Sequence, residues 1–136
     1  MNIPTQKLAV FLTFSGKAED AMHFYEDILP GASIESITRY KANQPMGDTG
    51  KVLNGALNFG GQQIMFMDMA AAQPAPGFSW STSLFIWCAD EAEFDKIFAE
   101  LSAGGSIMMG PEKVMELRKV AWVTDKFGVT WQLVWK

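Results

Sequence analysis

Hydrophobic and polar residues follow two distinct patterns along the first part of the chain. Residues 8–14, LAVFLTF, are almost continuously apolar and too few for a stable helix, which predicts a strand buried on both faces. Residues 15–29 begin with a serine, carry acidic residues in the first turns and place apolar side chains at helical spacing. This second pattern predicts an amphipathic helix that ends before Pro30 and Gly31.

Shorter segments with the composition of strands and turns follow this helix. Alternating apolar and polar residues indicate strands, and clusters of Gly, Pro and Asn between them indicate turns. The chain is predicted to continue with a strand at 32–40, a loop at 41–50, strands at 52–59 and 62–69, and a connector at 70–79. Because Gly60 and Gly61 separate the last two strands, these strands are expected to form a hairpin.

The same order of elements returns in the second half. Residues 81–89 predict another buried strand, and residues 90–103 predict another amphipathic helix with Asp90 as its N-cap. Gly104 and Gly105 end this helix. Residues 120–135 then predict a terminal hairpin that corresponds to the hairpin of the first half.

Direct self-comparison supports an internal repeat. A shift of 74 pairs identical residues: Phe11 with Phe85, Ala18 with Ala92, Glu19 with Glu93, Phe24 with Phe98, Glu26 with Glu100 and Gly31 with Gly105. A shift of 68 pairs Phe59-Gly60 with Phe127-Gly128 in the two hairpins. The sequence therefore predicts a tandem βαβββ repeat within a single domain, 1–136, with repeat units at about 7–69 and 80–136 and the connector 70–79 between them.

Composition narrows the class of protein. A chain of 136 residues with 49% hydrophobic and 19% charged residues is typical of one globular domain. The net charge is −4 and the basic residues are scattered, which argues against nucleic acid or an anionic membrane as a partner. The N-terminal sequence lacks a secretion pattern, and Cys88 is the only cysteine, so we expect a cytoplasmic protein without an internal disulfide.

The duplicated βαβββ pattern resembles the vicinal oxygen chelate superfamily, which includes glyoxalase I, bleomycin-resistance proteins and extradiol dioxygenases. AMHFYEDIL at 21–29 and DKFGVTWQL at 125–133 resemble its helix and closing-strand motifs. Together with GGQQIMFMD at 60–68, they look like the PhnB-like branch, often labelled 3-demethylubiquinone-9 3-methyltransferase-like. The resemblance implies an α+β fold in which the two units form a cupped mixed sheet with helices on its outer face, and it implies a homodimer.

The resemblance also raises two chemical expectations. Methyl transfer from S-adenosylmethionine usually needs a Gly-rich turn after the first strand of a parallel sheet, and SGKAED at 15–20 has one glycine, so that activity is not expected. Superfamily members normally hold a divalent metal with His, Glu or Gln from the first and last strand of each unit. The matching positions here are Ala9, Ile64, Ser83 and Gln132, which are too poor in donors for a metal, and no other cofactor is predicted.

Strand alternation predicts which side chains line the cup. If Val10, Leu12 and Phe14 pack under a helix, their neighbours face the cavity. The predicted ligand-binding residues are Ala9, Phe11, Thr13, Phe66, Asp68, Ser83, Phe85, Trp87, Trp122 and Gln132, and the same alternation turns Ile64 inward. Aromatic rings with a few polar groups are typical of a small-molecule site, although the rings may equally be filling of the cup itself.

Two classes of function follow. The first, which we prefer, is a protein that binds an apolar or aromatic small molecule without a metal, as bleomycin-resistance proteins do by sequestration. The second is a small-molecule enzyme, glyoxalase-like or dioxygenase-like, either metal-dependent or metal-free with Asp68 as a catalytic base. A scaffold without a ligand is the third alternative. His23, the only histidine, and Cys88 are interpreted as structural residues.

Overall fold

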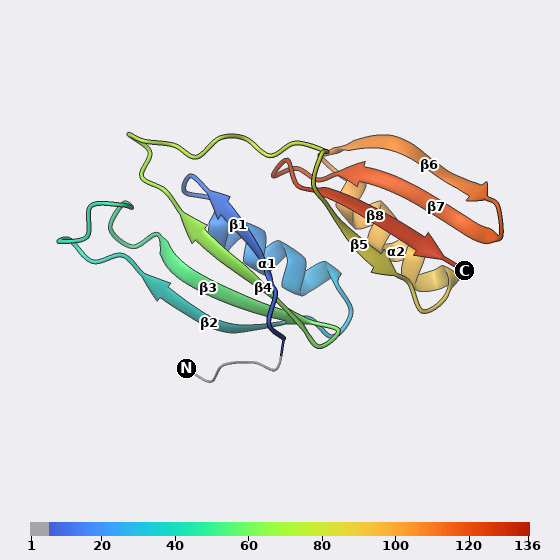
Figure 1. The fold of residues 1–136 in the computed structure, drawn as a ribbon, viewed down its shortest axis with the longest axis horizontal. Coiled ribbons are helices and arrows are strands. Elements are labelled where there is room, and N and C mark those ends of the chain that lie inside the picture. Colours follow the sequence, from blue (N-terminus) through green and yellow to red (C-terminus); the bar gives the residue numbers. More distant parts are fainter. Residues whose placement is uncertain (1–5) are drawn as a thin grey trace. The chain divides into compact units, whose positions relative to one another are not determined.

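The computed structural model describes residues 6–136, which form two compact units, one ending at Ala75 and the next beginning at Pro76. Figure 1 shows that each unit consists of one four-stranded sheet and one helix. The elements of the first unit are β1 (Val10–Phe14), α1 (Ala18–Ile28), β2 (Ser33–Arg39), β3 (Val52–Phe59) and β4 (Gln62–Asp68). The elements of the second unit are β5 (Ser83–Trp87), α2 (Glu91–Ser102), β6 (Ser106–Val114), β7 (Leu117–Thr124) and β8 (Thr130–Trp135).

The two sheets share one topology. The strand orders are β1-β4-β3-β2 and β5-β8-β7-β6, so the first strand of each unit lies beside the last. That pair is parallel, whereas the other two pairs in each sheet are antiparallel. The expected α+β fold of tandem βαβββ units with mixed sheets is therefore confirmed.

Helix α1 packs on one face of the first sheet through a close contact with β3. A Cβ atom added to Gly55 would lie 2.6 Å from the Met22 sulfur, so only glycine leaves room for that side chain. Deeper in the same core, the Phe66 ring lies 6.0 Å from that of Phe14 and 6.1 Å from that of Tyr25 on α1, measured between centroids. The apolar stripe predicted from helical spacing is this buried face of the helix.

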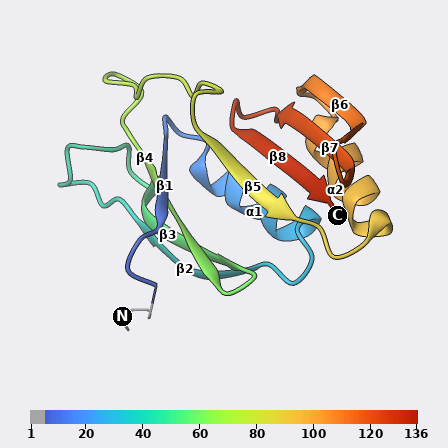
Figure 2. The ribbon, with the colours of Figure 1, turned by 45° about the vertical axis from the view of Figure 1, so that its right-hand side comes forward.

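Helix α2 covers one face of the second sheet in the same manner, as both Figure 1 and Figure 2 show. Its N-terminus is capped as predicted, because the Asp90 carboxylate accepts the Glu93 backbone N–H at 2.8 Å. Lys119 on β7 reaches the helix and donates to Asp95 at 2.7 Å, and it also pairs with Glu91 at 2.8 Å. This contact identifies the face of β7 that carries Lys119 as the helix-covered face.

The strand registers show which residues of the two units correspond. In the first unit Val10 pairs with Ile64, and in the second Leu84 pairs with Trp131. The shift from Val10 to Leu84 is 84 − 10 = 74, and the shift from Ile64 to Trp131 is 131 − 64 = 67. From residue 6 onward, neither helix has the length and apolar composition needed to cross a bilayer.

Candidate functional site

In each sheet, one face packs against the helix and the other does not. We call the second the helix-free face of that sheet. On β5, Ile86 is buried toward α2, so its neighbours Phe85 and Trp87 lie on the helix-free face. On β7 and β8, Trp122 and Gln132 pair directly and lie on that face too, since Lys119 has the opposite parity. The predicted residues Ser83, Phe85, Trp87, Trp122 and Gln132 thus share one surface of the second unit.

The aromatic rings of this surface are accessible. Phe85 is 47% exposed and Trp87 is 64% exposed, and their rings meet edge to face at 4.9 Å between centroids. Trp80, which sequence analysis did not select because it lies outside the periodic segments, places its ring 6.5 Å from that of Trp122. Exposed rings in mutual contact can bury a flat apolar molecule by stacking and edge contacts.

A polar pair lies beside these rings. The Gln132 side-chain amide donates from Nε2 to Ser83 Oγ at 2.8 Å. Gln132 Oε1 then remains a hydrogen-bond acceptor and the Ser83 hydroxyl remains a donor, and within residues 6–136 neither has a second side-chain partner. Rotating the amide by 180° exchanges these roles, so in both orientations the pair offers one donor and one acceptor.

Three predicted residues belong to the first unit. Phe11 and Thr13 lie on the helix-free face of its sheet, where they pair with Met65 and Met67. Phe11 is 47% exposed. Ala9 is half-buried and precedes β1, so it belongs to no strand.

The predicted orientation of β4 was wrong. Phe66 is fully buried and its ring contacts Tyr25 of α1, so it lies on the helix-covered face. Ile64 and Asp68 share this parity and are 5% and 1% exposed. Phe66 and Asp68 therefore do not line the helix-free face, which β4 supplies with Met65 and Met67 instead.

The physical reason is a difference between two connections. Strands β3 and β4 are joined by Gly60 and Gly61, whereas residues 125–129 join β7 and β8. Aligning the two Phe-Gly pairs at these turns gives the shift of 68, one more than the strand register allows. A slip of one residue moves every side chain of a strand to its other face. Gln132 consequently corresponds to Met65, and Trp122 corresponds to Ala56.

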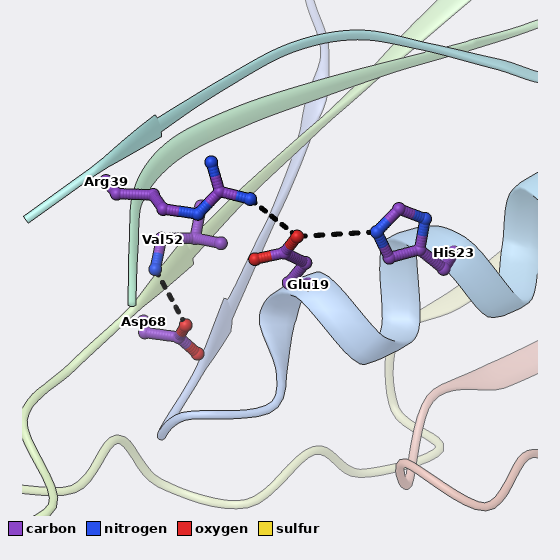
Figure 3. A network of polar contacts seen from close by, with 5 residues as sticks. All are labelled: Glu19, His23, Arg39, Val52 and Asp68. Carbon is purple, nitrogen blue, oxygen red and sulfur yellow. Dashed lines mark hydrogen bonds and ion pairs between the residues drawn. The ribbon is translucent and has the colours of Figure 1, made fainter. Parts of the chain in front are cut away.

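Asp68 has a structural role that accounts for its burial. One carboxylate oxygen accepts the backbone N–H of Gly16 at 2.7 Å and of Ala18 at 3.0 Å, at the start of α1. The other oxygen accepts the Val52 N–H at 3.1 Å, at the start of β3, as Figure 3 shows. With both oxygens occupied and 1% of the residue exposed, Asp68 is not placed to act as a catalytic base.

The residues at the superfamily's metal positions do not fit a divalent ion. Ala9 has no donor atom, Ile64 lies on the helix-covered face, and Met65 in its place offers a soft thioether. Ser83 and Gln132 bond to each other. Within the described residues, no three His, Cys, Asp or Glu side chains come together in a way that could hold an ion.

His23 takes part in an exposed polar network between α1 and β2 (Figure 3). Glu19 accepts a hydrogen bond from Arg39 at 2.6 Å and is paired with His23 at 3.4 Å. The hydrogen bond from Arg39 lowers the pKa of Glu19, with a smaller contribution from His23. The His23 side chain is 56% exposed, and such surface pairs contribute at most about 1 kcal/mol, which agrees with a structural role.

Cys88 is buried behind β5, and burial raises the pKa of its thiol to about 11, with the nearby Glu93 charge adding to the effect. The thiol is therefore protonated near neutral pH and is a poor nucleophile. This agrees with its interpretation as a structural residue.

The raised pKa of Cys88 predicts a loss of stability in alkali. The folded protein keeps the thiol protonated until about pH 11, whereas the unfolded chain ionises near the ordinary value of 9.0. The free energy of unfolding should thus fall by roughly 1–2 kcal/mol between these pH values through this group. Urea unfolding of the parent and of Cys88→Ala at pH 7.5, 9, 10 and 11 measures it. A difference between the two proteins that stays constant with pH would contradict the prediction.

Two mixed four-stranded sheets, each covered by one helix and arranged as a duplicated βαβββ unit, define the glyoxalase/bleomycin resistance/dioxygenase fold of the vicinal oxygen chelate superfamily. A sequence model of the 3-demethylubiquinone-9 3-methyltransferase family matches residues 6–134. The chain therefore belongs to this family, the PhnB-like branch of the superfamily.

Known proteins agree with this assignment. The structure of the PhnB protein from Bacillus cereus is 37% identical, with a TM-score of 0.87, and the match covers 96% of this chain and all of that one (100%). Protein YjdN of Escherichia coli K12 is 26% identical over 140 residues, covering 93% of this chain and 92% of YjdN. The fosfomycin resistance protein FosX from Listeria monocytogenes, in a complex with Mn(II), shares the fold at 10% identity, with a TM-score of 0.66 and coverage of 97% and 92%.

The methyl transfer in the family's name receives no support from this chain. A nucleotide-like cofactor such as S-adenosylmethionine is usually approached by free backbone N–H groups in a Gly-rich turn. Here the turn between β1 and α1 contains one glycine, Gly16, and its N–H already donates to Asp68 at 2.7 Å. Both sheets are mixed, not parallel.

Proposed function

We propose that the protein binds a flat, apolar or aromatic small molecule on the helix-free face of the second sheet, without a metal. The observation that carries this proposal is the Ser83–Gln132 hydrogen bond beside the accessible rings of Phe85 and Trp87. Each ring contact with a bound aromatic molecule contributes about 0.5–1.5 kcal/mol beyond the burial of area. The polar pair adds orientation to a surface that is otherwise apolar.

The polar pair also narrows the chemical class of the ligand. A phenol-type hydroxyl can donate to Gln132 Oε1 and accept from the Ser83 hydroxyl, so it satisfies both groups at once. A methyl ether lacks the donor and would leave the glutamine oxygen without a partner. We therefore propose a hydroxyaromatic molecule as the preferred ligand. As the superfamily resemblance suggests, we further propose that the protein acts in the cytoplasm as a homodimer.

The test uses 2-naphthol and 2-methoxynaphthalene as probes, with binding followed by the NMR signals of the tryptophan indole N–H groups. All five tryptophans follow residue 79, so these signals report on the second unit. We expect 2-naphthol to bind about five- to tenfold more tightly than its methyl ether, equivalent to about 1–1.4 kcal/mol for one hydrogen bond.

Variants of the polar pair locate the effect. In Gln132→Leu the preference for 2-naphthol should disappear, while the free energy of unfolding should change by less than about 1 kcal/mol because the residue is half-buried. Gln63→Leu, a half-buried glutamine in the first unit, is the matched control and should keep the preference. No binding of either probe would refute the proposed function, and an unchanged preference in Gln132→Leu would refute the role of the polar pair.

A further inference from the structure

The first unit contains a separate cavity of about 320 Å³ between its sheet and the loop that joins β2 to β3. The sheet contributes Leu53 and Met67, and the loop contributes residues from its rim. The complete lining is Tyr40, Gln44, Pro45, Met46, Leu53 and Met67. This cavity was not predicted, because residues 41–50 were recognisable from composition only as a loop.

Hydrogen bonds hold the loop in place at both its base and its tip. At the base, the Tyr40 N–H donates to the Lys51 carbonyl at 2.8 Å, and the Gly50 N–H donates to the Tyr40 carbonyl at 2.9 Å. Near the tip, the Met46 carbonyl accepts the Ala70 N–H at 2.9 Å. Asp48 also accepts the Ala71 N–H at 3.1 Å. The cavity is therefore formed before any ligand enters, which reduces the cost of ordering on binding.

Tyr40 and Gly47 fix the height of the loop above the sheet. The Tyr40 hydroxyl donates to the backbone carbonyl of Asp68 at 2.9 Å, which anchors the ring to the end of β4. A Cβ atom added to Gly47 would lie 1.9 Å from the ring atom Cε2 of Tyr40. Any side chain at position 47 must therefore push the loop away from the ring and deform the cavity wall.

The lining selects the chemistry of a ligand. None of the six lining residues is charged, so a charged molecule would lose its hydration without gaining a partner. The thioethers of Met46 and Met67 make favourable contacts with aromatic rings. Gln44 uses its Oε1 atom to accept the Lys41 N–H at 2.7 Å, which leaves Nε2 as a donor to a ligand oxygen.

We propose that this cavity is a second binding site, which takes a neutral aromatic molecule of one or two rings that carries a carbonyl or ether oxygen. Its size supports this class, because an apolar cavity of about 150 Å³ is known to hold benzene and this one is roughly twice as large. The site belongs to the first unit and uses none of the residues of the proposed aromatic surface of the second unit.

Methionine methyl NMR tests the proposal with acetophenone and benzoate, two probes of similar shape that differ in charge. With ε-¹³C-methionine, acetophenone should shift the Met46 and Met67 signals with a Kd of about 1 mM, as its nine heavy atoms suggest. Benzoate should bind at least fivefold more weakly. The Met115 signal should not move, since that residue is 89% exposed at the β6–β7 turn.

Two variants locate the site. Gly47→Ala should abolish the acetophenone shifts of the two methionines, whereas Gly77→Ala, where an added Cβ meets nothing within 4 Å, should keep them. Leu53→Phe, which fills the cavity from the sheet side, gives a second test if Gly47→Ala does not fold. Shifts that persist in both variants, or that benzoate produces equally, would overturn the proposal. The 2-naphthol test reads tryptophans of the second unit, so either proposal can fail alone.

Discussion

Replacing Asp68 with alanine should lower the free energy of unfolding by about 3–5 kcal/mol. The substitution removes the acceptor of three backbone N–H groups, those of Gly16, Ala18 and Val52, and two of these bonds are buried. A buried donor left without a partner costs about 1–3 kcal/mol. The start of α1 depends on this carboxylate in particular, because Lys17 at the N-cap position makes no side-chain hydrogen bond to the helix.

Urea unfolding followed by circular dichroism measures this loss, with Asp20→Ala as the matched control. Asp20 is an exposed aspartate in the first turn of the same helix, and its only printed partner is Lys17 at 3.7 Å, so its removal should cost less than about 1 kcal/mol. If Asp68→Ala were as stable as the control but no longer bound 2-naphthol, the carboxylate would belong to a ligand site and its structural role would be disproved.

Phe66→Ala should cost about 3–5 kcal/mol of stability, because it removes a fully buried ring that contacts Phe14 and Tyr25. Phe85→Ala provides the contrast. Phe85 is 47% exposed, so its removal should cost about 1 kcal/mol or less but should weaken 2-naphthol binding several-fold. Thermal and urea unfolding give the first comparison, and the indole N–H titration gives the second.

The two phenylalanines thus separate core from surface. Both were predicted to line a ligand site, and the structure assigns them to opposite kinds of face. Equal losses of stability in the two variants would show that Phe85 is also a core residue. Loss of 2-naphthol binding by a folded Phe66→Ala variant, with Phe85→Ala unaffected, would reverse the assignment of both.

The sequence was sufficient for the architecture because its signals were strong and repeated. The apolar run at 8–14 and the helical spacing that follows it recur at 81–103, so each copy supported the interpretation of the other. Alternation from Leu12 and Phe14 correctly placed Phe11 and Thr13 on the helix-free face, and the same logic placed Phe85 and Trp87.

The orientation of β4 could not be obtained in this way. It depended on transferring the register across two connections of different length, and sequence similarity at the Phe-Gly turns favoured an alignment that is one residue too long. The burial of Asp68 was also hidden, because its partners Gly16 and Val52 are 52 and 16 residues away in the chain. Contacts of this kind follow from tertiary structure and leave no local pattern.

The connection between β2 and β3 is where the two copies of the unit differ most. Residues 40–51 join these strands in the first copy, whereas Met115 and Glu116 alone join β6 and β7 in the second. Loop length has a small effect on stability and changes readily, while sheet registers do not. Duplication followed by divergence at this loop therefore gives a protein two related scaffolds with different surfaces. One copy can acquire a new selectivity by a change in loop length, while the other keeps its own.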